Sequence, residues 1–257
     1  MIRGKVCPPG FDAFRRTTIA LGLSMTNPNA DAIYGVGNLL IDDPARLTKA
    51  SGISTAITIP LPANVTLVGV TLHNTNATTS SITSGAGLSQ ALTVPAVDLD
   101  GQRLGARYFF TGLETGITDD GFVVNLSRAS GVVHIGRIAL WLVASNVNWE
   151  AGRDYGVVRP GDVIHRTRGG TVLHDPQGLR QRWWEMTFTL SEDATIYRGL
   201  EASSLGAVLP FPLVPDELVN DSAWVHTPEA YKEQLSEPGL ASIPRRFVEL
   251  CNGPING

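Results

Sequence analysis

Residues Val132–Val143 read VVHIGRIALWLV and carry the strongest strand signal in this 257-residue chain. Valine, isoleucine and tryptophan favour extended backbone because their bulky side chains fit a pleated surface. Gly136 interrupts the run, and a glycine inside a strand is typical of a bulge or a bend. We therefore expect a long strand that bends near Gly136.

Similar but shorter runs recur along the chain and are separated by Gly, Pro, Asn, Asp and Ser, a pattern typical of all-β domains. The clearest are residues 54–62 (STAITIPLP), 66–73 (TLVGVTLH), 122–126 (FVVNL) and 181–190 (QRWWEMTFTL). The last alternates apolar and polar positions, as a half-buried strand does.

Helical patterns are scarce. A segment from Ser191 (SEDATIYRGLEA) and another opened by Thr227-Pro228-Glu229 each predict one short helix. A composition shift over residues 146–154 predicts a boundary, with a β-rich unit at 1–150 and a smaller β-rich unit with one or two short helices at 151–257.

The composition excludes several function classes. Charged residues make up 17% of the chain and the formal net charge is −4, so no broad basic surface for nucleic acid is expected. No stretch of about 18 uncharged apolar residues predicts a membrane span, and the N-terminus lacks the pattern of a signal peptide. Cys7 and Cys251 stand far apart, and two thiols or one bridge between them both remain open.

No catalytic motif is apparent. The chain lacks the G-x-S-x-G turn of serine hydrolases, a phosphate-binding loop and a dinucleotide fingerprint. Its close acidic pairs, Asp98 with Asp100 and Asp119 with Asp120, stand beside glycines, where aspartate commonly bonds its own backbone in turns. We expect neither an enzyme nor a bound cofactor.

A hairpin is predicted around Gly169-Gly170, because two glycines can adopt the backbone angles of a two-residue turn. Counting outward from that turn sets His165 opposite His174. Two facing imidazoles are candidate metal ligands, but a third ligand is lacking, so no metal site is predicted.

Interface or ligand candidates come from the aromatic residues and the turns. Trp141 and Trp184 are expected in the core, whereas the alternation around Trp183 places it on the opposite face. The candidates for contact with a ligand or a partner are Trp183, Trp149, Gly169, Gly170 and Phe211, the last within the proline-rich stretch 208–215, which is expected to form an extended arm or a packed loop. The neutral stretch 74–84 is expected to face solvent or a host.

Several segments resemble β-sandwich proteins of tailed-bacteriophage tail tips and baseplates, which often carry a discoidin-like or carbohydrate-module-like jelly roll. The segments are GNLLIDDP (37–44), IGRIALWLVASNVNW (135–149), YGVV (155–158), HDPQG (174–178) and RWWEMTFTLSEDA (182–194). The resemblance concerns packing and turn patterns, and it carries over no functional residue.

The resemblance implies an N-terminal antiparallel, jelly-roll-like β-sandwich in a non-enzymatic virion structural protein. Such a subunit would be made in the host cytoplasm and would assemble in the tail as a trimer or hexamer with other tail proteins. The alternative is a carbohydrate-binding module for a host surface glycan. A glycan-cleaving enzyme ranks third, because no carboxylate pair stands out.

Overall fold

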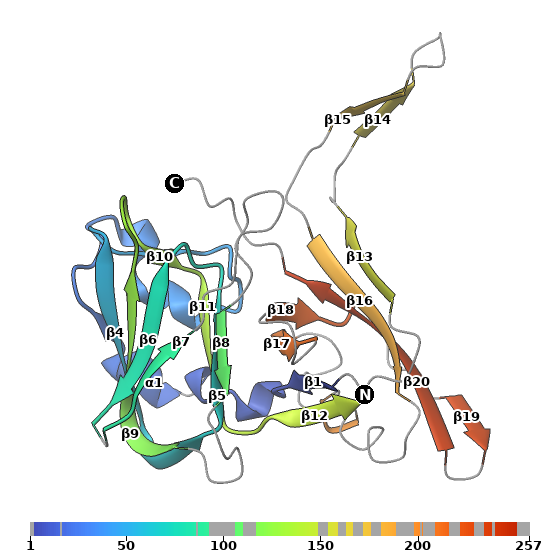
Figure 1. Ribbon diagram of the computed structural model, residues 1–257, viewed down its shortest axis with the longest axis horizontal. Coiled ribbons are helices and arrows are strands. Elements are labelled where there is room, and N and C mark those ends of the chain that lie inside the picture. The colour runs from blue at the N-terminus through green and yellow to red at the C-terminus, as the bar shows by residue number, and fades with distance from the viewer. Residues whose placement is uncertain are drawn as a thin grey trace.

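The computed structural model describes residues 3–15, 17–85, 87–92, 106–109, 117–148, 154–158, 163–166, 172–175, 181–188, 198–200, 202, 209–215, 222–228, 234–237 and 240–250 (Figure 1). Strands dominate, and every strand pairing in these residues is antiparallel. The strands are β1 (Arg3–Val6), β2 (Ser24–Met25), β3 (Thr48–Lys49), β4 (Ser54–Leu67), β5 (Gly69–His73), β6 (Thr79–Ser84), β7 (Ser89–Leu92), β8 (Ala106–Phe109), β9 (Ile117–Ser127), β10 (His134–Ile135), β11 (Arg137–Trp141), β12 (Ser145–Asn148), β13 (Asp154–Val158), β14 (Val163–Arg166), β15 (Val172–Asp175), β16 (Gln181–Phe188), β17 (Phe211–Val214), β18 (Ala223–His226), β19 (Gln234–Glu237) and β20 (Leu240–Glu249).

The helices are short and lie mainly near the N-terminus. They are α1 (Thr17–Gly22) and the 3-10 turns η1 (Pro9–Phe11), η2 (Ala13–Arg15), η3 (Ala32–Tyr34) and η4 (Val36–Leu40). The prediction of a mainly β, antiparallel protein is confirmed. Of the helix expected from Ser191, residues 198–200 and 202 are described and are helical, while the helix expected after Thr227 falls largely outside the described residues.

Three sheets form successive layers, visible from left to right in Figure 1. The outer layer is the five-stranded sheet β2-β4-β9-β6-β7, the middle layer is β11-β5-β8, and the third is an eight-stranded sheet ordered β12-β1-β17-β18-β20-β16-β13, with β19 paired to β20. The first two layers form the sandwich. Its core includes Ile57, Phe122 and Val124 from the outer sheet and Leu72 and Ile138 from the middle sheet.

Strands β5 and β11 of the middle sheet are buried on both faces, which explains the apolar run that dominates the sequence. All residues of β5 and β11 are buried. Alternate residues such as Ile138 and Leu140 belong to the sandwich core, whereas Ala139 and Trp141 belong to a second cluster that includes Trp224 of the eight-stranded sheet. A strand covered on both faces has no solvent-facing position, so its sequence does not alternate.

The expected interruption at Gly136 separates β10 from β11. The backbone NH of Gly136 donates to the carbonyl oxygens of His73 (3.2 Å) and Asn74 (3.0 Å). A Cβ atom at this position would lie 2.0 Å from the carbonyl oxygen of Pro44. Only glycine lets the two backbone segments approach this closely, so the bend is fixed by packing.

The eight-stranded sheet combines strands from both sides of residue 150. β1 lies between β12 and β17, with Lys5 opposite Val214 and Val6 opposite Leu213. The proline-rich stretch therefore includes an interior strand of this sheet, which corrects the expectation of a contact arm. The division into units at 1–150 and 151–257 stays a prediction.

Candidate binding groove

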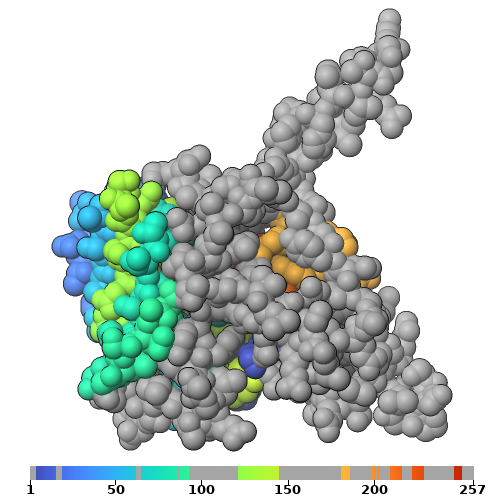
Figure 2. Space-filling view, viewed as in Figure 1, coloured from blue at the N-terminus to red at the C-terminus, as the bar shows by residue number. Residues whose placement is uncertain are grey.

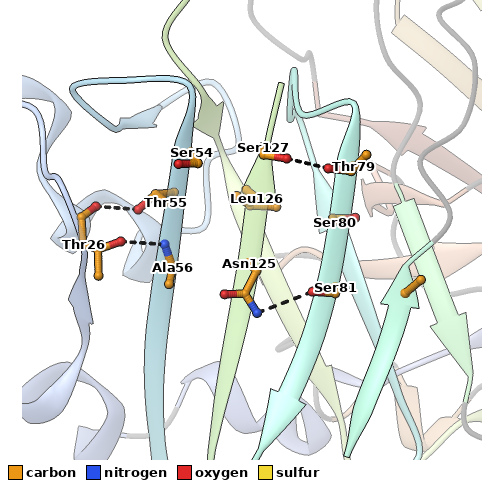
Figure 3. A pocket seen from close by; sticks show the side chains of 11 residues that line it. Thr26, Ser54, Thr55, Ala56, Thr79, Ser80, Ser81, Asn125, Leu126 and Ser127 are labelled. Atoms are coloured by element: carbon orange, nitrogen blue, oxygen red, sulfur yellow. Dashed lines mark hydrogen bonds between the residues drawn. The ribbon is translucent and has the colours of Figure 1, made fainter. Parts of the chain in front are cut away.

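A groove of about 520 Å³ lies on the outer face of the five-stranded sheet (Figure 3). On the left of Figure 2, residues of β4, β9 and β6 lie side by side at the surface. The groove is lined by Thr26, Ser54, Thr55, Ala56, Thr79, Ser80, Ser81, Ala91, Asn125, Leu126 and Ser127. Its volume falls in the range of small-molecule sites.

Strand alternation creates the groove. On β9, Val124 and Leu126 point into the sandwich core, so Asn125 and Ser127 take the outward positions. Pairing brings equally small outward residues alongside: Ala56 and Ser81 both lie opposite Asn125. Small side chains on adjacent strands leave a depression in which the asparagine amide is the longest polar group.

Hydrogen bonds fix the walls of the groove. The hydroxyl oxygens of Thr79 and Ser127 lie 2.5 Å apart. The backbone NH of Ala56 donates to Thr26 Oγ1 (2.8 Å), and the Thr55 hydroxyl donates to the Thr26 carbonyl oxygen (2.6 Å). These contacts join β4 to the segment after β2 and β9 to β6, so the concave shape is present before any ligand arrives.

Asn125 and Ser54 keep hydrogen-bonding capacity toward the groove. Asn125 Nδ2 donates to Ser81 Oγ at 3.4 Å, which is longer than the usual 2.7–3.2 Å, and Oδ1 accepts no hydrogen bond from the described residues. The Ser54 hydroxyl likewise has no partner among the described residues. The described lining residues carry no carboxylate, imidazole, thiol, amine or guanidinium. These residues can therefore bind neutral polar groups through hydroxyl, amide and backbone atoms.

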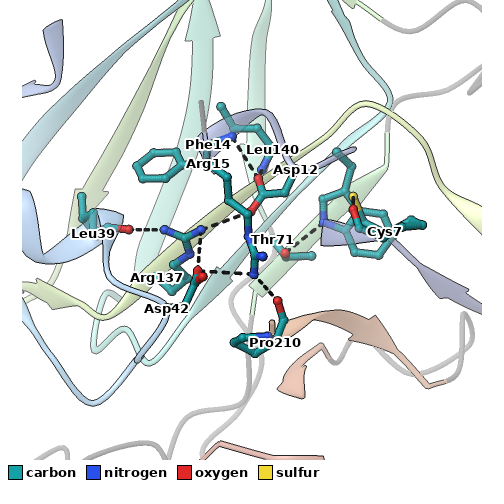
Figure 4. A network of polar contacts seen from close by, with 12 residues as sticks. Cys7, Asp12, Phe14, Arg15, Leu39, Asp42, Thr71, Arg137, Leu140 and Pro210 are labelled. Carbon is teal, nitrogen blue, oxygen red and sulfur yellow. Dashed lines mark hydrogen bonds and ion pairs between the residues drawn. The ribbon is translucent and has the colours of Figure 1, made fainter. Parts of the chain in front are cut away.

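A second polar cluster lies between the middle sheet and the eight-stranded sheet (Figure 4). Arg137 is fully buried, and its Nη2 lies 3.3 Å from Asp12 Oδ2 and 3.1 Å from Asp42 Oδ1. Arg15 Nη2 lies 3.3 Å from the same Asp42 oxygen. Both guanidiniums stand over the Trp224 ring, at 5.0 Å for Arg137 and 5.4 Å for Arg15. Cation–π contacts of this kind strengthen as water is excluded, so the cluster ties the layers together.

Burial controls the ionisation of this junction. Desolvation raises the pKa of the Asp12 carboxyl, against the opposing effect of Arg137. Desolvation also lowers the pKa of His73, with Arg137 and Arg182 adding repulsion, to about 3. His73 is therefore neutral at physiological pH, with its Nε2 3.0 Å from Thr71 Oγ1. The groups are enclosed and lie outside the groove lining, so we interpret this junction as structural.

A separate buried ion pair lies within the eight-stranded sheet. Arg182 donates to both carboxylate oxygens of Glu249, Nε to Oε2 at 2.7 Å and Nη2 to Oε1 at 2.6 Å. The Arg182 guanidinium also stands 5.2 Å from the Trp184 ring centre. This two-bond geometry holds β16 beside β20, and it explains why an arginine occupies an inward position of a strand predicted to be half-buried.

The expected facing of His165 and His174 is corrected by the strand register. His165 lies opposite Leu173 and His174 lies opposite Ile164. A two-residue turn at Gly169-Gly170 would set Arg166 opposite Leu173, but Arg166 pairs with Val172. The register is therefore shifted by one residue, and the two histidines are not cross-strand partners. The described residues contain no cluster of three or more metal-ligating side chains.

The residues predicted to contact a ligand or a partner lie in different environments. Phe211 is fully buried and makes an edge-to-face contact with Phe247, with ring centres 6.1 Å apart, so it belongs to the core of the chain and offers no exposed contact. Trp183 is half-buried, with the Arg246 guanidinium 4.7 Å from its ring centre. Trp149, Gly169 and Gly170 lie outside the described residues. As expected, Trp141 and Trp184 are buried.

The neutral stretch 74–84 divides into two parts. Asn74, Thr75 and Asn76 are buried, and their side chains bond backbone carbonyls; Asn76 Nδ2, for example, donates to Val132 O at 2.9 Å. This corrects the expectation that the whole stretch faces outward. Its later part forms β6 and supplies Thr79 and Ser81 to the groove. No helix in the described part of the chain is long and apolar enough to cross a membrane.

Sequence reasoning did not identify the residues of the groove. They are serine, threonine, alanine and asparagine, which are common on any solvated strand. The available signal was the run of small or neutral residues at the alternate positions 54, 56, 79, 81, 125 and 127. That signal becomes meaningful only when the register places the three strands side by side.

No protein-family model matches the sequence, and a comparison with curated proteins gives no match. Among solved structures, the family 32 carbohydrate-binding module of Streptococcus pneumoniae EndoD matches with a TM-score of 0.35 and 11% identity, covering 47% of this chain and 95% of that one. The S. pneumoniae fucose-binding module SpX-3 gives 0.33 and 11%, covering 48% and 96%. A Ruminococcus gnavus GH29 fucosidase gives 0.38 and 16%, covering 50% and 26%, so this chain spans only about a quarter of that enzyme. With TM-scores below 0.4, these likenesses do not decide the ligand of this chain.

Proposed function

We propose that the chain is a binding protein that holds a neutral glycan in the groove of its five-stranded sheet without transforming it. The observation that carries this proposal is the set of described lining residues, which combine hydroxyl and amide groups and include no charged side chain. Sugars present hydroxyl groups that both donate and accept hydrogen bonds, and such a lining complements them. An anionic ligand would find no counter-charge there, and an apolar ligand would leave polar groups unpaired.

The test is a glycan array probed with the full chain and with two variants. Ala56→Phe places a large ring in the groove, and Thr58→Phe places the same ring at the next outward position of β4, which does not line the groove. We expect the wild type and Thr58→Phe to bind the same neutral glycans, and Ala56→Phe to bind at least tenfold more weakly. Equal loss in both variants, or preference for sialylated or sulfated glycans, would contradict the proposal.

We also propose that the chain assembles with copies of itself as a trimer or hexamer. The supporting observation is the hairpin β14–β15, which pairs with no other described strand and extends away from the three layers (Figure 1). A two-stranded hairpin alone is at best marginally stable in water, so contact with another surface would stabilise it. Placement of the assembly in a bacteriophage tail rests on the sequence resemblance and stays a proposal.

Light scattering over a range of concentrations tests the assembly. The comparison is between the full chain and a variant in which residues 163–175 are replaced by a short Gly-Ser linker. We expect a discrete oligomer for the full chain and a smaller species for the variant. A monomer at every concentration would refute self-assembly and leave the groove proposal intact.

A further inference from the structure

Asn125 lies on β9, between the groove strands β4 and β6, and is the one amide among the described lining residues. It lies near the C-terminal end of β9, opposite Ala56 of β4 and Ser81 of β6 (Figure 3). Neither neighbour is long enough to cover the amide, which is half-buried. The group is thus held at the base of the groove by strand pairing while its polar end remains accessible to a ligand.

The hydrogen bonds of the groove show which polar groups already have partners in the protein and which can still bind a ligand. The Thr79 and Ser127 hydroxyls bond to each other, and the Thr26 hydroxyl accepts a backbone NH. Asn125, in contrast, has an unused acceptor at Oδ1 and donates only one long bond from Nδ2, to Ser81. Among the described lining residues, Asn125 is therefore the side chain that offers a donor and an acceptor on two separate atoms, whereas the unpartnered Ser54 hydroxyl offers both on one oxygen.

A planar amide places its acceptor and its donor side by side in one plane. Two hydroxyl groups on adjacent ring carbons match this pair, since one can donate to Oδ1 while its neighbour accepts from Nδ2. A single hydroxyl satisfies only one of the two positions, and a hydroxyl beside an ether oxygen satisfies both only when the hydroxyl faces Oδ1. A vicinal diol satisfies both in either order, so the chemistry of the amide favours a vicinal diol.

We infer that Asn125 is the specificity-determining residue of the groove and that it binds two adjacent free hydroxyl groups of a neutral sugar. The inference rests on the proposed glycan-binding function and narrows its ligand class. The Ser54 hydroxyl, exposed at the edge of the same groove, supplies a further contact to the bound ring. Each hydrogen bond that is lost leaves an unpaired polar group, so removal of either hydroxyl weakens binding about five- to tenfold.

The test uses neutral methyl hexopyranosides (galactoside, glucoside, mannoside and fucoside) with their monodeoxy and mono-O-methyl derivatives. Binding is measured by NMR titration of the full chain and of Asn125→Ala, Asn125→Asp and the control Thr58→Ala. Asn125→Asp keeps an acceptor but removes the donor, so it separates the two hydrogen bonds. Thermal unfolding of each variant confirms that it is folded.

We expect the wild type and Thr58→Ala to lose affinity when either of two adjacent hydroxyls is changed. Asn125→Ala should bind the parent sugar about tenfold or more weakly and no longer distinguish the derivatives at those two positions. Unchanged affinity in Asn125→Ala, with sugar binding by the wild type, would overturn the assignment of Asn125 and leave the glycan proposal standing. Absence of binding to every sugar by the wild type would overturn both.

Discussion

Acidification should destabilise this fold through the buried histidine His73. His73 lies between the middle and eight-stranded sheets, with its ring centre 5.4 Å from that of Trp224. Its Nε2 lies 3.0 Å from Thr71 Oγ1, and that oxygen also accepts a hydrogen bond from Trp141 Nε1 at 3.1 Å. The threonine hydroxyl is therefore free to donate to a neutral imidazole. Burial, reinforced by nearby arginines, holds the pKa of His73 at about 3, against 6.5 for an ordinary histidine.

The sign of the effect follows from which state binds the proton first. As pH falls below 6.5, the unfolded chain takes up a proton at residue 73 while the folded chain does not, so the free energy of unfolding decreases. The contribution is fully present above about pH 6.5 and is lost progressively toward pH 3. At about 1.36 kcal/mol per pH unit, the loss is about 2 kcal/mol between pH 6.5 and 5 and about 5 kcal/mol over the whole window.

The assay is urea unfolding followed by tryptophan fluorescence at pH 7.5 and 5.0, for the wild type and His73→Gln. Glutamine is neutral at both pH values, so the variant lacks the slope due to His73. The raised pKa of Asp12 acts in the opposite direction, because its folded state is favoured by protonation, but it acts in both proteins and cancels in the comparison. We expect the wild type to lose about 2 kcal/mol more than the variant between the two pH values. Parallel losses in the two proteins would refute the reasoning.

Three further predictions concern packing and ion pairs, and each is checked by urea unfolding at pH 7.5. Gly136→Ala should lower the free energy of unfolding by about 3 kcal/mol or more, because the added methyl would overlap a backbone carbonyl. The control Gly37→Ala, with no atom within 4 Å of its Cβ position, should change it by less than about 1 kcal/mol. Similar effects in the two variants would contradict the packing argument. Arg182→Lys should cost about 2 kcal/mol, because an ammonium cannot make both bonds to Glu249 in the same geometry, and an unchanged midpoint would show that the second bond contributes nothing. Arg137→Met should cost about 3–5 kcal/mol, because two aspartates lose their buried counter-charge, and a stability gain would mean that the ion cluster is less favourable than apolar packing.

The strands of this fold could largely be predicted from sequence because their signals are local. Alternation of apolar and polar residues predicted β16, and a continuous apolar run predicted β11, which is covered on both faces. The insertion of β1 between β12 and β17 could not be predicted in this way. It places β1 beside strands that lie about 140 and 210 positions later in the sequence. The periodicity within a strand carries no information about which strand it pairs with.

The candidate site was harder to predict than the fold. Binding residues stand out in a sequence when they are rare or reactive, and the groove is built from serine, threonine and one central asparagine. The error over His165 and His174 has a different origin. Register in a hairpin depends on its turn, and a shift of one residue changes every cross-strand partner. Sequence predicted the presence of this hairpin but not its pairing.

Charged residues make up only 17% of the chain, and the structure reduces the charge at the surface further. Part of the charge is enclosed between the layers, where Asp12 and Arg137 are buried, and in the Arg182–Glu249 pair. The outer sheet can therefore present small neutral residues around Asn125 without loss of the ionic contacts that join the layers. The buried ion pairs stabilise the interior, and the groove selects its ligand through hydrogen bonds.

Selection by hydrogen bonds alone sets an upper limit on affinity and connects the two proposed functions. The described lining residues offer no aromatic ring and no charged group, and a few hydrogen bonds of about 1 kcal/mol each correspond to dissociation constants near the millimolar range. An oligomer that presents several such grooves to one surface would gain avidity on the order of 10²- to 10⁴-fold without any new contact. Weak binding of a monosaccharide and strong retention of the assembled protein on a glycan-coated surface are therefore expected together. If an isolated monomer were retained as strongly as the oligomer, the ligand would have to contact more of the chain than this groove.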